Sequence, residues 1–136
     1  YKRQPLILMG HGTEHAADGS YAILETAIRN YGDHEIYIAT VEGAVTIEDV
    51  IARMQKKHAS STNKKMSNQR VVVTPFMLVA GDHANNDMAG SDDDSWLSQF
   101  KASGKFDKID TQINGLGEIE GIQKLYVEHT AAAMGK

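Results

Sequence analysis

The sequence predicts an α/β fold in three layers, in which an open parallel sheet of about four strands is flanked by helices. Short apolar runs typical of buried strands alternate along the chain with longer segments whose apolar residues recur at helical spacing. The four predicted strands are Leu6–Met9, Glu35–Val41, Arg70–Ala80 and Lys108–Asn114. Because a helical segment follows each strand, the strands are expected to run parallel, with helices on both faces of the sheet.

The predicted helices are Ala16–Tyr31, Thr46–His58, Ser91–Ala102 and Glu118–Met134. Thr46 and Asp49 have the spacing of a capping box at the start of the second helix. A serine followed by three aspartates begins the third, where the helix dipole favours acidic side chains. Pro75 is expected to interrupt or end the third strand. We interpret the polar segment Ala59–Gln69 as a surface loop and Tyr1–Pro5 as the end of a connection.

Composition excludes several classes of protein. The 136 residues include 41% hydrophobic and 24% charged side chains, which fits a single globular domain able to bury a core. The net charge of -4 argues against a nucleic-acid binder, because such proteins carry a basic face. No apolar run reaches the length of about 18 residues that a membrane span needs. We therefore expect no nucleic-acid or membrane partner and a cytoplasmic location, with the periplasm as the alternative.

The polar residues that follow the predicted strands indicate a metal site. The chain has no cysteine, so a metal ion must be held by His, Asp or Glu. In open parallel sheets, ligands bind beyond the carboxyl ends of the strands. His11 follows the first predicted strand, Glu42 the second and His83 the third, each beside glycine or a small residue. Two imidazoles and a carboxylate suit Co²⁺, Fe²⁺, Ni²⁺ or Zn²⁺, and three protein ligands leave coordination positions open.

Simpler interpretations apply to the histidines one at a time. A single histidine at a strand end is commonly a hydrogen-bonding loop residue, and the case for a metal rests on three such positions at once. His15 joins His11 only if the stretch between them is helical, and otherwise lines the pocket or orients a ligand. Solvated or capping roles are expected for the remaining histidines, His34, His58 and His129.

Two other groups of residues have alternative interpretations. The acidic stretch Asp82–Asp94 fits a solvated loop leading into a helix N-terminus, or a negative funnel that concentrates cations at the mouth of the site. We expect Met9, Met77 and Met88 to pack in the core, because hard and borderline divalent ions prefer imidazole and carboxylate ligands.

Three sequence motifs together resemble the anaerobic sirohydrochlorin cobaltochelatase family, a class II chelatase. They are Gly10–His15 (GHGTEH), Ala39–Gly43 (ATVEG) and Pro75–Gly90 (PFMLVAGDHANNDMAG). The third is long and specific, whereas the first two count mainly in combination. The resemblance extends from about Leu6 to near the C-terminus. It implies a chelatase-like fold with flavodoxin-like winding, built as two similar α/β halves around a substrate cleft, and residues 1–136 match the C-terminal half.

The resemblance implies a lyase of cobalamin biosynthesis that inserts Co²⁺ into sirohydrochlorin, with Fe²⁺ as a related substrate. It implies that His11, Glu42 and His83 hold the metal and form the catalytic site, and that His11 also accepts a proton. The metal is then a substrate, and no organic cofactor is expected. Members of the family are about twice this length, so a missing N-terminal half or a second subunit is the expected partner beside the tetrapyrrole.

Charge supports the expectation of a partner. Sirohydrochlorin is a polycarboxylate, whereas this chain is acidic, so much of the substrate cradle is expected from the other half. The candidate cationic contacts in this chain are Lys2, Arg3, Lys64, Lys65 and Arg70.

Two other functions remain open from the sequence. A non-catalytic carrier of metal or tetrapyrrole would use the same three residues to bind without inserting. A metal-dependent hydrolase would hold water in the open coordination position. The hydrolase is disfavoured because the sequence has neither a second carboxylate cluster for another metal nor a glycine-rich loop for phosphate.

Overall fold

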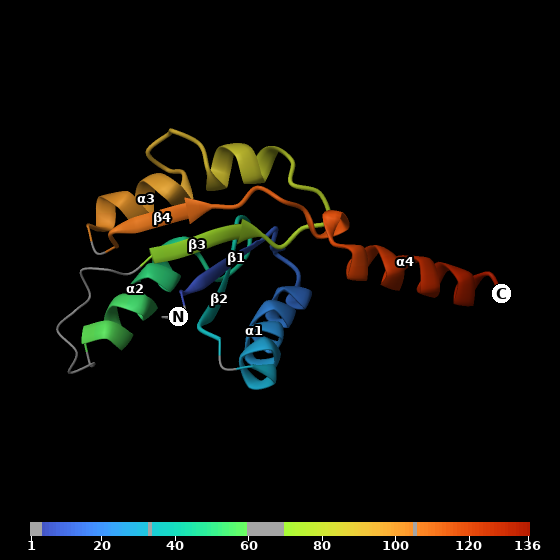
Figure 1. Ribbon diagram of the computed structural model, residues 1–136. Helices are drawn as coiled ribbons and strands as arrows, with labels where there is room; N and C mark the ends of the chain where they lie inside the picture. The colour runs from blue at the N-terminus through green and yellow to red at the C-terminus, as the bar shows by residue number, and fades with distance from the viewer. Residues whose placement is uncertain (1–3, 33, 60–69, 105) are drawn as a thin grey trace.

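A computed structural model describes residues 4–32, 34–59, 70–104 and 106–136 (Figure 1). Its four strands are β1 (Leu6–Gly10), β2 (Ile36–Thr40), β3 (Arg70–Pro75) and β4 (Lys108–Thr111). They form one sheet in the order β2-β1-β3-β4, and all three strand pairs are parallel. This order has the flavodoxin-like winding that was predicted, and the strand order reverses between β1 and β3.

Helical segments connect and follow the strands. They are η1 (Ala16–Gly19), α1 (Ser20–Tyr31), α2 (Ile47–Ala59), η2 (His83–Met88), α3 (Trp96–Ser103), η3 (Leu116–Glu118) and α4 (Glu120–Ala133). Thr46 and Asp49 form the predicted capping box, since the Asp49 backbone N–H donates to the Thr46 hydroxyl and the Thr46 backbone N–H donates to the Asp49 carboxylate.

The two faces of the sheet bury cores of different size. Alternate strand residues such as Ile7, Met9 and Val73 point to the face covered by α2 and α3, where the larger apolar cluster includes Trp96 and Phe100. Residues of opposite parity pack under α1 in a smaller cluster whose buried members are Leu8, Ile36 and Ile38. Because β1 and β2 are buried on both faces, they are apolar at nearly every position.

The structure changes the bounds of two predicted elements and adds one that was not predicted. The third strand ends at Pro75, which is one of the two outcomes expected there, and the residues from Phe76 to Ala80 leave the sheet. The third helix begins after Ser95 rather than Ser91, because the buried Ser95 hydroxyl accepts from the Ser98 N–H and donates to the Gly90 carbonyl. A π-helix, η2, was not predicted and occupies the start of the acidic stretch.

The predicted loop Ala59–Gln69 falls largely on residues 60–69, which lie outside the described residues, as do residues 1–3 of the predicted connection.

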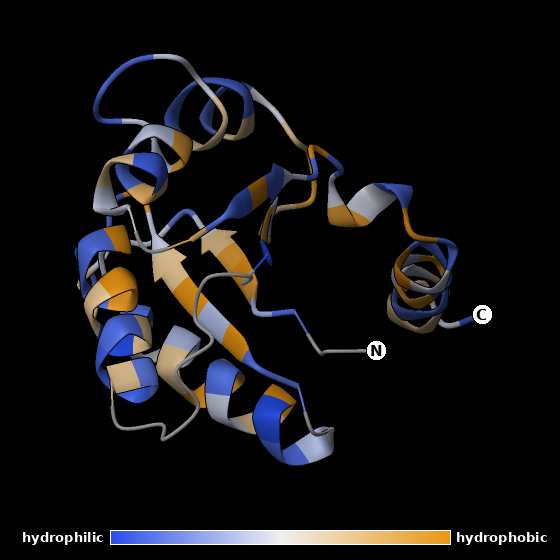
Figure 2. Cartoon of the chain, turned by 60° about the vertical axis from the view of Figure 1, so that its left-hand side comes forward, coloured by the Kyte–Doolittle hydropathy of each residue, from blue (hydrophilic) through white to orange (hydrophobic). Residues whose placement is uncertain are grey.

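The last helix does not cover the sheet. No residue of α4 is buried, and the helix projects from the body of the domain (Figure 1). Apolar residues lie along it without a covering layer (Figure 2), and Tyr126 and Val127 are 58% and 68% exposed. The expectation that this helix would pack on the sheet is therefore wrong for the chain alone. Within the described residues, no helix is long and apolar enough to cross a bilayer.

A charged cluster closes the open edge of the sheet at β2. The carboxylate of Glu25, 8% exposed, accepts hydrogen bonds from the Ile38 backbone N–H and from Arg53, and lies 3.4 Å from Arg29. Arg29 in turn donates to the Ile36 carbonyl. Side chains thus satisfy backbone groups of β2 that a neighbouring strand would otherwise pair, which protects the edge from association. We call Glu25, Arg29 and Arg53 the edge cluster.

Candidate metal centre

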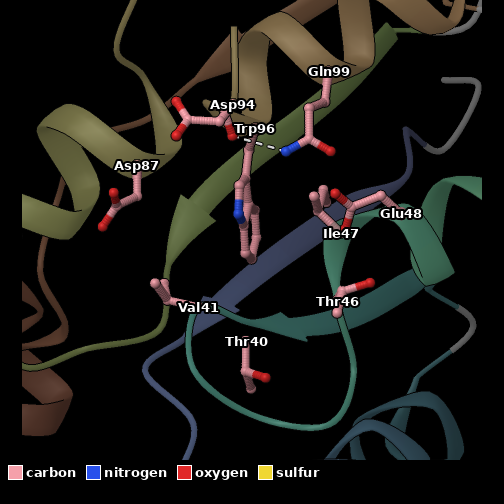
Figure 3. A pocket seen from close by; sticks show the side chains of 9 residues that line it. All are labelled: Thr40, Val41, Thr46, Ile47, Glu48, Asp87, Asp94, Trp96 and Gln99. Atoms are coloured by element: carbon pink, nitrogen blue, oxygen red, sulfur yellow. Dashed lines mark hydrogen bonds between the residues drawn. The ribbon is translucent and has the colours of Figure 1, made fainter. Parts of the chain in front are cut away.

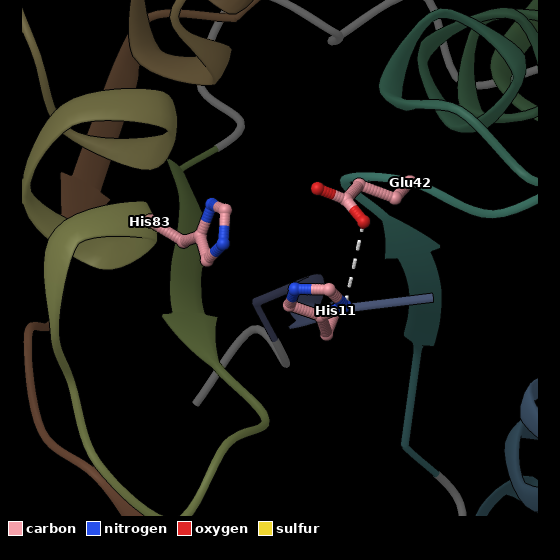
Figure 4. A group of neighbouring side chains, drawn as sticks. All are labelled: His11, Glu42 and His83. Atoms are coloured by element: carbon pink, nitrogen blue, oxygen red, sulfur yellow. Dashed lines mark ion pairs between the residues drawn. The ribbon is translucent and has the colours of Figure 1, made fainter. Parts of the chain in front are cut away.

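The three predicted ligands meet at one edge of the sheet. His11 directly follows β1, Glu42 lies two residues after the end of β2, and His83 is the first residue of η2, after β3. One potential ligand atom from each lies within 4.8 Å of the other two. Figure 4 shows the three side chains converging from the three segments on a common point. We call these residues the site cluster; the described part of the structure has no other group of this kind.

Glycine lets the loop after β1 and the loop after β2 approach closely. The Glu42 backbone N–H donates to the His11 carbonyl at 2.8 Å, which continues the pairing of β1 with β2 beyond the strands. Gly12 has φ of 84°, and a Cβ there would lie 2.4 Å from the Gly43 backbone nitrogen. Any other residue at position 12 would therefore be strained and would push the two loops apart. The closeness of His11 and Glu42 depends on this contact.

Asp18 ties the same two loops together. Its carboxylate accepts from the Thr13 backbone N–H at 3.1 Å and from the Ala44 backbone N–H at 2.8 Å. Thr13 belongs to the loop after β1 and Ala44 to the loop after β2, so one side chain bridges the segments that carry His11 and Glu42. Sequence reasoning missed this residue, because its partners are backbone groups and one is 26 residues away.

The η2 helix holds His83 in place. Ala84 and Met88 are completely buried in the larger core and fix one side of this short helix. His83 lies on the adjoining side, and its Nδ1 is 2.5 Å from the carboxylate of Asp87, four residues later. Since Nδ1 is engaged by this contact, Nε2 is the ring nitrogen left for a ligand.

The two imidazoles stand edge to face. Their ring centroids are 4.9 Å apart, and the planes meet at 82°. His11 Nδ1 lies 3.0 Å from the Gly12 carbonyl and 3.9 Å from the Glu42 carboxylate. The side chains of His11, Glu42 and His83 are 49%, 58% and 34% exposed, so a cation and a large ligand can both reach them. The donor set suits a borderline divalent ion with coordination positions left open.

Comparison with known proteins gives the family. Residues 1–135 match the family model described as cobalt chelatase (CbiK). The chain belongs to this cobalt chelatase family. It is 31% identical over 131 residues to "Sirohydrochlorin cobaltochelatase CbiKC" of Nitratidesulfovibrio vulgaris, which covers 96% of this chain and 42% of that protein. It is 32% identical over 134 residues to "Sirohydrochlorin cobaltochelatase" of Salmonella typhimurium, covering 96% of this chain and 45% of that protein.

These matches confirm the predicted family resemblance. They also show that the chain spans less than half the length of the relatives it matches. The site cluster lies in the matched region, between residues 1 and 135.

The other histidines lie outside the site cluster. His15 precedes η1, where its Nδ1 accepts from the Ala17 backbone N–H, so it caps that helix rather than joining His11. The solvated role expected for His58 is wrong, because its side chain is 10% exposed and lies 3.9 Å from the Glu35 carboxylate. His58 lies in the last turn of α2, and the capping role stays a prediction. His34 and His129 are exposed, as expected.

The structure also corrects one candidate substrate contact. Arg70 is the first residue of β3, at the amino end of a strand, and it forms an ion pair with Asp110 of β4. The site cluster lies at the carboxyl ends, so the prediction that Arg70 contacts a tetrapyrrole carboxylate is wrong for this site. Lys2, Arg3, Lys64 and Lys65 lie outside the described residues.

A hollow of about 200 Å³ lies between α2, η2 and α3 (Figure 3). The acidic side chains that line it are Glu48 of α2, Asp87 of η2 and Asp94, two residues before α3, and the indole of Trp96 lies beside them. Asp87 also contacts His83, so the hollow adjoins the site cluster. Whether these carboxylates concentrate cations, as the funnel hypothesis holds, stays a prediction.

Proposed function

We propose that this chain is the metal-binding half of a chelatase that inserts Co²⁺ into sirohydrochlorin. The observation that carries the proposal is the convergence of His11, Glu42 and His83 at the carboxyl edge of the sheet, with ligand atoms within 4.8 Å of one another. The names of the two relatives supply the metal and the tetrapyrrole. The exposure of the three side chains supports a transfer site, because a buried and fully coordinated site would retain its metal.

Cobalt is proposed as the substrate metal. Neutral imidazole and carboxylate ligands bind Co²⁺, Fe²⁺, Ni²⁺ and Zn²⁺, so the ligands alone select weakly among them. Insertion rates measured with each ion, at equal free concentration, test this choice. The proposal requires Co²⁺ to give the highest kcat/KM; a higher value for Fe²⁺ would assign the chain to iron insertion instead.

Metal insertion has to release two protons. The inserted ion would be bound by all four ring nitrogens; two of these lose their N–H bonds, and the two protons pass to a base or to water. His11 is the proposed acceptor, because an imidazole can act as a base and the nearest partners of this one are a backbone carbonyl and Glu42. One nitrogen lone pair cannot bind cobalt and accept a proton together, so these steps occur in sequence or through Glu42 or water.

A second α/β unit is proposed to complete the enzyme. Exposed large apolar residues concentrate on α4, on the loop before it and on the neighbouring segment between β3 and η2. Ile113 of the first loop is 40% exposed, and Leu78 and Val79 of the second segment are 47% and 73% exposed. The backbone N–H groups of Leu116 and Gly117 donate to the carbonyls of Met77 and Leu78, which fixes the base of α4 beside the segment leading to His83. An apolar surface of this kind beside the site suits a docking partner.

The insertion reaction tests the proposed function. We expect His11→Ala and His83→Ala to lower kcat for Co²⁺ insertion at least 100-fold when the protein is paired with its second unit. His34→Ala is the matched control, because His34 is exposed and lies outside the site cluster. Near-normal turnover in both site variants would contradict the proposal.

The same assay separates an enzyme from a carrier. A carrier that binds metal or tetrapyrrole without inserting would give no metallated product above the uncatalysed rate, even with the unsubstituted protein. That result would support the carrier function and overturn the chelatase function.

A further inference from the structure

Asp87 has a contact that the proposed reaction does not yet use. Its carboxylate lies 2.5 Å from His83 Nδ1, yet it is not one of the three residues whose ligand atoms converge. The Asp87 side chain is 45% exposed, so burial alone does not account for its position. The contact therefore requires an explanation in terms of His83.

The η2 helix repeats the same kind of link three times. Asn85 donates to the Gly81 carbonyl at 2.8 Å, and Asn86 donates to the Asp82 carboxylate at 2.5 Å. The contact of His83 with Asp87 is the third, and each joins a residue to the one four positions later. The first two pairs contain only residues of η2 and its N-terminal flank. The third pair contains His83, which is also a member of the site cluster.

The two imidazoles of the site cluster differ in their partners. His11 Nδ1 faces the carbonyl of the adjacent Gly12 at 3.0 Å, a neutral acceptor on its own loop. His83 Nδ1 instead faces a full carboxylate. A carboxylate that accepts from one ring nitrogen fixes the tautomer and the ring orientation, and makes the other nitrogen a better metal donor. His83 is therefore the more firmly oriented of the two imidazoles.

We propose that Asp87 is a positioning residue, which holds the His83 ring so that Nε2 faces the point shared with His11 and Glu42. The inference rests on the proposed metal centre and adds a residue to it. The π-helical geometry of η2 sets the spacing, since the buried Ala84 and Met88 anchor the helix while His83 and Asp87 pair on its adjoining side. Local π-helical turns frequently occur at functional sites.

The ring of His83 can be observed without metal. In the protein produced from its own gene, ¹⁵N NMR of the histidine side chains distinguishes a proton on Nδ1 from a proton on Nε2. We expect His83 to carry its proton on Nδ1 in the unsubstituted protein, and to lose this preference in Asp87→Ala. An unchanged His83 tautomer in Asp87→Ala would overturn the proposal, whether or not the protein binds cobalt.

Cobalt binding gives the second measurement. Calorimetric titration with Co²⁺ is expected to show an affinity reduced about 10- to 100-fold in Asp87→Ala, which is the usual effect of removing an outer partner of a metal-bound histidine. Asp87→Asn is expected to lose less, because its amide oxygen still accepts from Nδ1–H. The Co²⁺ absorption bands should also shift in Asp87→Ala, which a general loss of stability would not produce.

Control variants separate this inference from the metal centre itself. Asp93→Asn changes an exposed carboxylate in the following turn and should bind Co²⁺ as the unsubstituted protein does. If His83→Ala also binds Co²⁺ normally, the proposed metal centre fails. If His83→Ala loses binding while both Asp87 variants keep affinity within twofold, the metal centre stands and the role of Asp87 is overturned.

Discussion

Two clusters of ionisable side chains in this chain have opposite characters. In the edge cluster, Glu25 is nearly buried and its oxygens are occupied by Arg53, Arg29 and a backbone N–H of β2. In the site cluster, the side chains are 34–58% exposed. The hydrogen-bond contacts of the two rings within the described residues involve Nδ1, so each Nε2 is left for a metal. Ionisable side chains that pair with one another, as in the edge cluster, stabilise a fold. Metal-ligating side chains that converge without pairing, as in the site cluster, indicate a ligand site.

The largest effect should come from breaking the edge cluster. Glu25→Ala leaves Arg53 and the Ile38 backbone N–H without their acceptor, and is expected to lower the free energy of unfolding by about 3 kcal/mol. The hydrogen bond to Glu25 raises the pKa of Arg53 in the unsubstituted protein. Because a guanidinium is not deprotonated in proteins, Arg53 also keeps its charge when this partner is removed. Urea denaturation measures the loss, and a change below about 1 kcal/mol would contradict a structural role for this cluster.

The site cluster should respond in the opposite way. Glu42→Gln removes a charged ligand whose side chain is 58% exposed, so stability should change by less than about 0.5 kcal/mol. Affinity for Co²⁺ should fall on the order of 100-fold, which corresponds to about 2.8 kcal/mol. Calorimetric titration checks this, with Glu14→Gln as the control, since Glu14 is an exposed carboxylate outside the cluster. Equal losses of Co²⁺ affinity in both variants would indicate that any nearby negative charge attracts the ion, and would contradict the assignment of Glu42 as a ligand.

A residue between these extremes is Asp18, which is structural but serves the site. Asp18→Ala removes two hydrogen bonds to the backbones of Thr13 and Ala44, and should cost about 1 kcal/mol of stability. Because the bridged loops carry His11 and Glu42, we expect Co²⁺ affinity to fall about tenfold as well. Loss of stability with unchanged affinity would show that the loops hold their spacing without the bridge.

The prediction with the smallest effect at neutral pH concerns Tyr37 of β2, whose ring faces Arg29 and Arg53 of the edge cluster. Burial, helped by the hydrogen bond to Glu35, raises the pKa of Tyr37 to about 12 from 10.0. The folded state therefore keeps the phenol proton longer than the unfolded chain does, and stability should fall as pH rises from about 10 to about 12. In Tyr37→Phe, the free energy of unfolding should depend less on pH between about 10 and about 12, as measured by urea denaturation at several pH values in this range. An equally steep decline in the variant would assign the effect to other groups.

Much of this architecture follows from local sequence patterns. Continuous apolar runs such as Leu6–Met9, separated by helical periodicity, predict the parallel sheet, and hence that residues after its strands lie at one edge. The winding of the sheet was expected from the family resemblance. His11, Glu42 and His83 were found in this way, because the end of a strand fixes where the next side chains lie. The family match agrees with the motifs that contain them.

The features missed by the sequence analysis depend on distant partners. Both Ser91 and Ser95 fit a helix cap, and the Gly90 carbonyl together with burial of Ser95 favours the second. The η2 helix has too few residues for a periodic pattern, so the pairing of His83 with Asp87 was not predicted. The apolar pattern of α4 correctly predicts a helix, but a pattern cannot show whether the surface that covers it belongs to the same part of the protein.

Anomalous X-ray scattering at the cobalt edge tests the central claim most directly. A crystal of the protein soaked in Co²⁺ should show its strongest anomalous peak between His11, Glu42 and His83, with Co–N distances close to the roughly 2.0–2.1 Å typical of imidazole bound to comparable metals. A strongest peak elsewhere, with no density between these three side chains, would contradict the account.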